Sequence, residues 1–207
     1  MRKVLPILFN TEMVRAILDG RKTCTRRLVK TRRKDACGFY VTRKTDDSFA
    51  GIYEYDENES MFDNPLEPPY QPGDILYVRE TWKKALNGYY YYESWQKNDI
   101  ADITKWKPSI HMPKEAARIW LKVTDVRVER LQEMDWREAL DEGVNTQFPR
   151  DKETGEYIFD ENPIDDFIDL WNSTIKKSDI DRYGWNANPY VWVIEFERCE
   201  KPETKVN

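Results

Sequence analysis

The sequence is poor in the residues that build covalent cross-links and metal sites. It has three cysteines in 207 residues, and no two of them form a CxxC pair. An odd number of widely spaced cysteines predicts neither a disulfide framework nor a zinc site, and it suits a reducing compartment. A single histidine, His111, argues against a His-based catalytic triad and a multi-histidine metal centre. We therefore expect no metal and no other cofactor.

Long apolar runs are also missing. No stretch approaches the ~20 apolar residues that a membrane-spanning helix needs. The short apolar run near the N-terminus turns polar and has no small-residue cleavage site, so it does not resemble a secretory signal. These absences predict a soluble, intracellular protein of the cytoplasm, with no membrane partner.

Acidic residues outnumber basic ones, with 38 Asp and Glu against 33 Lys and Arg. This balance argues against indiscriminate coating of nucleic acids. However, residues 21–34, RKTCTRRLVKTRRK, hold eight basic side chains and no acidic one. The field of exposed charges fades within about 8 Å at physiological salt. This segment, which we call the basic ribbon, can therefore form a local anion-binding site on an acidic protein.

Hydrophobic periodicity predicts several strands and a few short helices. Asn10 or Thr11 can cap the first helix, and Gly20 is a suitable stop. Asp135 and Glu138 have the spacing of a reciprocal capping box at the start of a second helix. The expected strands are 4–9 (an edge strand), 75–82, 88–94, 117–131 and 188–198, and the expected helices are 11–19, 135–142 and 167–173.

The apolar positions of the 117–131 strand change phase near Thr124-Asp125, which predicts a bulge or bend. Many strands, few helices and no βαβ rhythm favour an α+β fold, a mixed β-barrel with short flanking helices, over a doubly wound sheet. We expect one domain over residues 1–207, with surface insertions at 35–70 and 145–165.

The basic ribbon contains a recognisable motif. Gly20-x-Lys22-x-x-Thr25-x-Arg27, after a short helix, resembles the signature of the ASCH domain, a branch of the PUA-like superfamily. Five segments resemble, in this order, one prophage-encoded group of ASCH-like proteins: PILFNTEMVRAILDGRKTCTRR, PGDILYVRETW, PSIHMP, TDVRVERLQ and NPYVWVIEFER. The resemblance covers most of the chain and is weakest in the two expected insertions.

This resemblance implies a PUA-like barrel whose cleft binds RNA or a modified nucleoside. One bacterial branch, with a much shorter chain, is an N4-acetylcytidine amidohydrolase with a proposed Lys, Thr and Glu catalytic set. Lys22 and Thr25 match the first two by position. Glu142 matches the third when the strands ending at Leu131 are aligned. Arg26 is a departure, because the hydrolase branch has an apolar residue there.

The three residue types can cleave an amide. Thr25 offers a nucleophilic hydroxyl, a neutral Lys22 can take its proton, and a protonated Glu142 can give a proton to the leaving nitrogen. Structural alternatives stay open for each of them. Lys22 would then belong to a solvated loop, Thr25 to an ordinary strand pair, and Glu142 to an exposed helix end.

Three functional classes follow from these residues. The first is a hydrolase of an N4-acylated nucleoside or, less favoured, a ribonuclease. The second is a module that reads RNA or a modified base without turnover. The third, weaker class is a phage protein that acts on a host protein through its acidic surface. For the nucleic-acid classes, we expect Arg21, Arg26, Arg27 and Lys30 to contact the ligand.

Other chemistry-bearing residues have simpler interpretations. His111 precedes Met112-Pro113 and suits a hydrogen-bonded turn. Cys24 suits a small buried position without chemistry. Tryptophans can stack a nucleobase, but a tryptophan in a strand usually belongs to the core. The tryptophans concerned are Trp82, Trp185 and Trp192.

Overall fold

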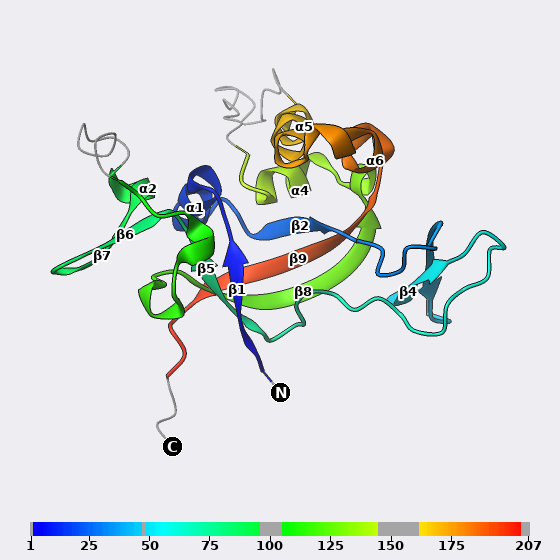
Figure 1. Ribbon diagram of the computed structural model, residues 1–207, viewed down its shortest axis with the longest axis horizontal. Coiled ribbons are helices and arrows are strands. Elements are labelled where there is room, and N and C mark those ends of the chain that lie inside the picture. Colours follow the sequence, from blue (N-terminus) through cyan, green and yellow to red (C-terminus); the bar gives the residue numbers. More distant parts are fainter. Residues whose placement is uncertain (1, 47–48, 96–104, 145–161, 204–207) are drawn as a thin grey trace, which may run out of the picture.

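The computed structural model describes residues 2–46, 49–95, 105–144 and 162–203. A five-stranded sheet forms its centre, in the order β1-β5-β8-β9-β2 (Figure 1). These strands are β1 (Val4–Leu8), β2 (Cys24–Leu28), β5 (Ile75–Arg79), β8 (Trp120–Arg130) and β9 (Tyr190–Cys199). β1 pairs with β5 in parallel, and the other neighbours in this sheet pair antiparallel.

The α+β class is confirmed, but the expected β-barrel is not closed within the described residues. β1 and β2 are the two edges of an open sheet, which confirms the edge position predicted for the first strand. We call the gap between β1 and β2 the seam. No backbone ladder of described residues spans the seam, but the Arg27 side chain does, and its Nη2 donates to the Leu8 carbonyl at 3.1 Å. Closure stops here because β1 ends at Leu8 and the chain turns into a helix capped by Asn10.

The predicted helix starts are confirmed. Asn10 Oδ1 accepts from Met13 N at 2.8 Å at the start of α1 (Thr11–Leu18). Helix α4 (Trp136–Asp141) begins with the predicted capping box. Asp135 Oδ1 accepts from Glu138 N at 2.9 Å, and Glu138 Oε2 accepts from Asp135 N at 3.2 Å. These bonds satisfy amide groups that have no partner inside a helix.

The predicted irregularity of the long strand is also confirmed. The β8–β9 register shifts between Val123 and Asp125. Val123 and Val128, on either side of the shift, both pack into the main hydrophobic core. The extra residue lets both halves of the strand direct an apolar face to the same core.

Helices cover one face of the sheet (Figure 1). They are α4, α5 (Pro163–Thr174) and α6 (Ile180–Tyr183). Phe167 and Trp171 of α5 pack against Val191 and Val193 of β9. Helix α5 begins earlier than the predicted 167–173 helix because Asn162 caps it and Pro163 fits its first turn. The rest of the expected 145–165 insertion, residues 145–161, lies outside the described residues.

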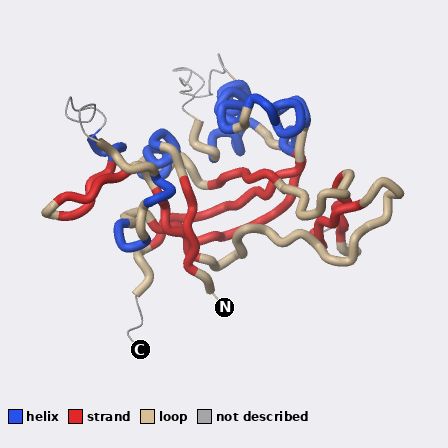
Figure 2. Tube along the Cα trace, viewed as in Figure 1, coloured by secondary structure: helices blue, strands red, loops and turns tan. Residues whose placement is uncertain are grey.

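Two hairpins stand apart from the main sheet, at opposite ends of the molecule (Figure 2). The first joins β3 (Gly38–Arg43) to β4 (Phe49–Tyr55), and it lies within the expected 35–70 insertion. The second joins β6 (Trp82–Ala85) to β7 (Gly88–Tyr91), and α2 (Tyr92–Trp95) follows. The strand predicted at 75–82 is therefore two strands, and the one predicted at 88–94 ends at Tyr91.

Short 3-10 turns connect the remaining elements. The bounds are η1 (Ser109–His111), η2 (Lys114–Ala116), η3 (Leu131–Glu133), η4 (Lys177–Asp179) and η5 (Trp185–Ala187). The turn predicted at His111 is confirmed by η1. Among the described residues, no helix has the length and apolar character needed to cross a membrane.

Candidate functional site

The start of the basic ribbon is fixed against two helices. Gly20 has a φ of +77°, as predicted for a helix stop, and it turns the chain back at the end of α1. The amides of Arg21 and Lys22 both donate to the Ala16 carbonyl, at 2.8 and 3.1 Å. Thr23 N then donates to the Asp141 carbonyl at 2.8 Å. These backbone bonds hold the ribbon beside the end of α4.

Lys22 and Glu142 meet at this junction. Lys22 Nζ lies 2.6 Å from Glu142 Oε2 and 2.8 Å from the Glu142 carbonyl oxygen. The two residues are only 2% and 3% exposed. The solvated-loop and exposed-helix-end interpretations of these residues are therefore wrong. A proton can move along such a short, water-shielded contact, so the pair can act as one proton-transfer unit.

Gly143 makes this contact possible. Its φ is +86°, and a Cβ atom there would lie 2.7 Å from Ala16 Cβ and 2.9 Å from Lys22 Cβ. Any larger residue would push α1 and Lys22 away from the end of α4. The helix stop predicted at Gly143 is confirmed, and the structure adds its role in close packing.

A second cation approaches Glu142 from its other side. Arg26 Nη1 lies 3.5 Å from Glu142 Oε1, and Arg26 Nη2 lies 3.0 Å from Glu138 Oε2. The Arg26 side chain is fully buried, which weighs against the predicted contact with a phosphate. Glu142 Oε1 is buried and accepts no hydrogen bond within the described residues. The carboxylate therefore keeps one acceptor oxygen for a ligand or a proton.

Thr25 lies close in sequence but is not joined to this pair. It is 1% exposed and stands opposite Ile194 in the β2–β9 ladder, so it does occupy an ordinary strand pair. Its hydroxyl makes no hydrogen bond with a described residue, including Lys22 and Glu142. The structure thus brings together two of the three predicted catalytic residues by direct contact.

Cys24 is buried beside the same carboxylate. Burial, and then the negative charge of Glu142, raise the pKa of the Cys24 thiol far above its usual range. A thiol in this state is a poor nucleophile. The prediction that Cys24 has no chemical role is consistent with this environment.

A cleft of about 460 Å³ opens beside Glu142, and neither Lys22 nor Thr25 lines it. Glu142 and Gly143 lie on one side of it, and α1 and α5 supply the others. The cleft carries charges of both signs, because Arg15 and Arg21 line it together with acidic residues. It is large enough to hold part of a nucleoside-sized ligand against Glu142.

The other three basic residues predicted to contact nucleic acid differ in how freely their side chains could reach a ligand. Arg21 donates to the Gly143 carbonyl at 2.9 Å and lies 3.4 Å from Asp19. Burial lowers the pKa of Arg27, which makes no ion pair with a described residue. Lys30 is exposed and lines a separate groove of about 450 Å³ with Arg27. The predicted contacts of these three residues with nucleic acid stay predictions.

The tryptophans considered for base stacking have limited exposure. Trp82 and Trp192 are each 5% exposed and belong to hydrophobic cores. Trp185 packs edge-on against Phe167 in the helical layer. The core interpretation is therefore correct for Trp82 and Trp192.

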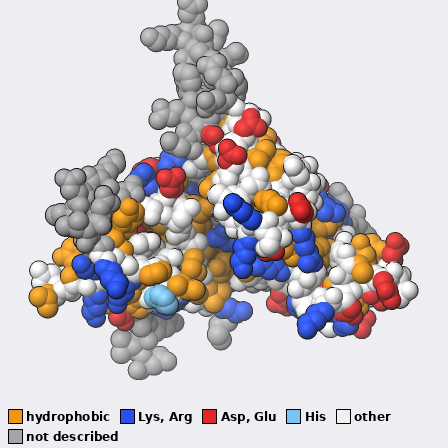
Figure 3. Space-filling model, turned by 45° about the horizontal axis from the view of Figure 1, so that its top comes forward, with side chains coloured by type: hydrophobic (Ala, Val, Ile, Leu, Met, Phe, Trp, Pro, Cys, Tyr) orange, Lys and Arg blue, Asp and Glu red, His pale blue; other side chains and the backbone are white. Residues whose placement is uncertain are grey.

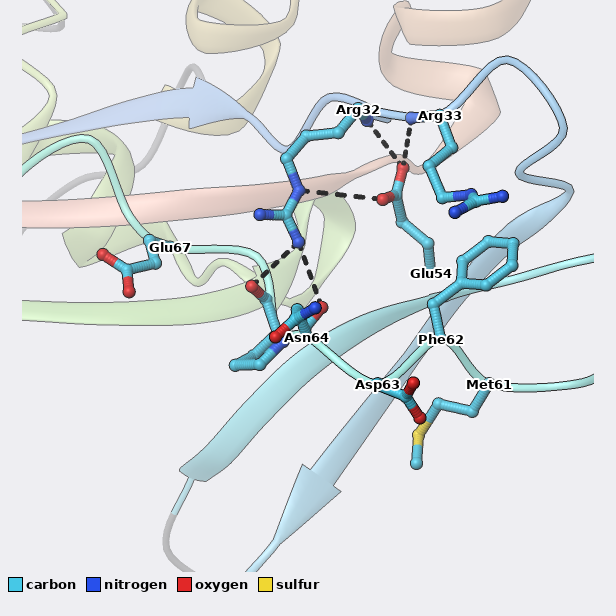
Figure 4. A pocket seen from close by; sticks show the side chains of 9 residues that line it. Arg32, Arg33, Glu54, Met61, Phe62, Asp63, Asn64 and Glu67 are labelled. Carbon is cyan, nitrogen blue, oxygen red and sulfur yellow. Dashed lines mark hydrogen bonds and ion pairs between the residues drawn. The ribbon is translucent and has the colours of Figure 1, made fainter.

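Sequence reasoning missed a buried carboxylate inside the 35–70 insertion. Glu54 Oε1 accepts from the amides of Arg32 and Arg33, at 2.6 and 3.2 Å (Figure 4). The Arg33 guanidinium lies 4.1 Å from the Phe62 ring centroid. These contacts line a pocket of about 590 Å³ and tie the end of the basic ribbon to β4. No local pattern marks Glu54, because its partners are 21 and 22 positions away.

Comparisons with known proteins add little to this picture. No protein-family model matches the chain, and no curated protein matches it. One similar solved structure is that of the hypothetical protein PH0355, with 13% sequence identity. The match covers 95% of this chain and 99% of that chain, with a TM-score of 0.37. A likeness of this degree supports no argument about fold or function.

Proposed function

We propose that the cleft at Lys22 and Glu142 binds a nucleoside and hydrolyses an N-acyl group from its base, as in the amidohydrolase branch of the ASCH family. The observation that carries the proposal is the 2.6 Å contact between the Lys22 and Glu142 side chains, buried beside a cleft. The two residues lie 120 positions apart in the chain and match two of the three catalytic residues of that branch.

The reaction needs one nucleophile and a route for its proton. The Thr25 oxygen attacks the acyl carbon while its proton passes to a neutral Lys22 amine. The tetrahedral intermediate collapses, the C–N bond breaks, and the base nitrogen takes a proton from Glu142. Water then cleaves the acyl-threonine ester and gives its hydroxyl to the released carboxylic acid. The remaining proton of the water and the proton held by Lys22 return to Thr25 and Glu142, which leaves Lys22 neutral again. The net change is one water consumed, one amine formed and one acid formed.

The open sheet fits this proposal as an incomplete PUA-like barrel. The seam between β1 and β2 lies beside α1, and α1 contributes residues to the cleft. The Arg27 side chain crosses the seam to the Leu8 carbonyl. In this proposal the protein works in the cytoplasm, in the phage or prophage setting that the sequence resemblance implies.

A specific observation favours a second candidate, a module that reads a modified base without turnover. Thr25 makes no hydrogen bond to Lys22 within the described residues, so no activated nucleophile is in place in the free protein. In the reader, Glu142 Oε1, which accepts no hydrogen bond there, would accept from a base amino group.

The two candidates separate in one assay on N4-acetylcytidine, with turnover and equilibrium binding both measured. Thr25→Val keeps the shape of the side chain and removes its hydroxyl, whereas Thr25→Ser keeps a hydroxyl. A hydrolase loses ~100-fold or more in turnover with valine and keeps most of it with serine. The matched control is Thr42→Val, on the separate β3–β4 hairpin, which should turn over like wild type.

Further variants test the proton route. Glu142→Gln should lose ~100-fold or more in turnover with little change in affinity, because an amide accepts hydrogen bonds but gives no acidic proton. Lys22→Ala should abolish turnover. If Lys22→Ala keeps near-full activity, the catalytic assignment is wrong. Binding without turnover by wild type would identify the reader, and neither binding nor turnover would refute both candidates for a free nucleoside.

A further inference from the structure

The unpaired basic charge of this protein lies mostly outside the basic ribbon. A cluster of it lies on the lobe formed by residues 79–95 and 105–118, which we call the hairpin lobe and which lies at the left of Figure 3. The lobe has seven Lys and Arg against three Glu, although acidic residues predominate in the whole chain. Arg118 pairs with Glu80 and Glu93. The other six cations make no ion pair with a described residue: Arg79, Lys83, Lys84, Lys105, Lys107 and Lys114.

Aromatic rings alternate with these cations. Lys84 Nζ lies 5.6 Å from the Tyr89 ring centroid, and Lys107 Nζ lies 5.1 Å from that of Trp82. The Tyr89 and Trp82 centroids are 5.7 Å apart, which completes a row of cation, ring, ring and cation. Backbone bonds between Trp82 and Lys107, at 3.1 and 2.8 Å, fix one end of this row, and the β6–β7 ladder, in which Lys84 stands opposite Tyr89, fixes the other.

Two buried donors in the same lobe lack an acceptor among the described residues. One is Trp82 Nε1, on a side chain that is 5% exposed, and the other is Arg79 Nε. Buried donors are normally paired, so each such atom calls for an explanation. Both groups can only donate, and Lys107 lies over the Trp82 ring. An oxygen-rich anion beside Lys107 would supply the acceptor that Trp82 Nε1 lacks.

We propose that the hairpin lobe binds a strand of single-stranded nucleic acid. Lys84 and Lys107 contact phosphates, Trp82 Nε1 donates to an oxygen of the strand, and the half-buried ring of Tyr89, on the same face, packs against a base. The alternation of cations and rings distinguishes this ligand from an acidic peptide, whose charges need no ring beside them.

The position of the lobe connects it to the cleft. Helix α2 of the lobe packs against α1, where Arg15 Nε lies 3.7 Å from Glu93 Oε1. Arg15 also lines the cleft that contains Glu142. A strand on the lobe can thus continue across α1, which would make the substrate a polynucleotide rather than a free nucleoside. The continuation of the strand into the cleft rests on the proposed function, but the binding of a strand by the lobe does not.

The test is fluorescence anisotropy of the full chain with a labelled, unacylated oligouridylate, measured at several salt concentrations. The double variant Lys84→Gln/Lys107→Gln should bind ~10-fold more weakly. Its slope of log affinity against log salt should fall by about 1.4, because each lost phosphate contact on a single strand removes about 0.7. The matched control is Lys176→Gln/Lys177→Gln, two exposed lysines at the start of η4, which should bind like wild type.

Trp82→Phe tests the buried donor, since it keeps an aromatic ring and loses only the indole N–H. It should bind several-fold more weakly with an unchanged salt slope, and a wild-type far-UV circular dichroism spectrum with a cooperative urea transition shows that it has folded. Equal binding by wild type and the lysine double variant would overturn the proposal, as would no binding by wild type. Binding to anionic lipid vesicles but not to the oligonucleotide would assign the lobe to a membrane surface and also overturn it. Turnover is not measured here, so failure of the proposed function leaves this result intact.

Discussion

Replacing Gly143 by alanine should destabilise the protein much more than replacing Gly20. Both glycines have positive φ angles, +86° and +77°, so alanine is conformationally strained at either position. The left-handed conformation costs an L-residue with a side chain roughly 1–2 kcal/mol. The surroundings differ, because a Cβ at Gly20 meets nothing within 4 Å. At Gly143 it meets Ala16 Cβ at 2.7 Å and Lys22 Cβ at 2.9 Å.

These contacts set the expected difference. Real Cβ atoms do not approach so closely, so α1 and Lys22 must move away from the end of α4. Overpacking of this kind typically costs about 1–3 kcal/mol. Gly20→Ala should therefore lower the free energy of unfolding by roughly 1–2 kcal/mol through strain alone. Gly143→Ala should lower it by roughly 2–5 kcal/mol, as strain and overpacking add.

Urea denaturation of both variants, followed by circular dichroism, measures the difference. The midpoint should fall in both variants, with the larger fall in Gly143→Ala and no change in the slope. Gly143→Ala should also reduce any turnover, because it displaces Lys22 from Glu142, whereas Gly20→Ala should not. Equal destabilisation by the two substitutions would refute the close approach of α1 to the end of α4.

Three further predictions concern the surroundings of the site. Arg26→Met should destabilise the protein by about 1–3 kcal/mol, because buried Glu142 and half-buried Glu138 each lose one cation and keep only Lys22 and Arg127, and urea midpoints would check this; a loss below about 1 kcal/mol would contradict the buried network. Asp135→Ala should cost about 1 kcal/mol through loss of the helix cap, measured in the same way, and no loss would mean that the capping box is not formed. Cys37 is exposed and should react with a thiol reagent at pH 8 in the folded protein. Cys24 should react only after unfolding, because burial raises the pKa of its thiol; rapid labelling of Cys24 in the native state would show that the site is open to solvent.

The sequence by itself determined the features that depend on neighbouring residues. The cap at Asn10 and the capping box at Asp135 and Glu138 were predictable, because each bond joins groups three positions apart. The bulge in β8 was visible as a phase change in one strand. The motif of Lys22 was visible for the same reason, since its residues lie within eight positions of one another.

Only the tertiary structure decided which charges are paired. Lys22 and Glu142 meet across 120 positions, and Arg26 and Glu138 across 112, and no local pattern encodes either contact. Folding neutralises much of the basic ribbon in this way and leaves cations without an ion pair on other surfaces, the hairpin lobe among them. The open sheet was likewise beyond prediction, because alternating apolar residues show that strands form but do not show which edges pair. That choice depends on long-range contacts, which here end β1 at the helix cap and leave a side chain of β2 to cross the seam.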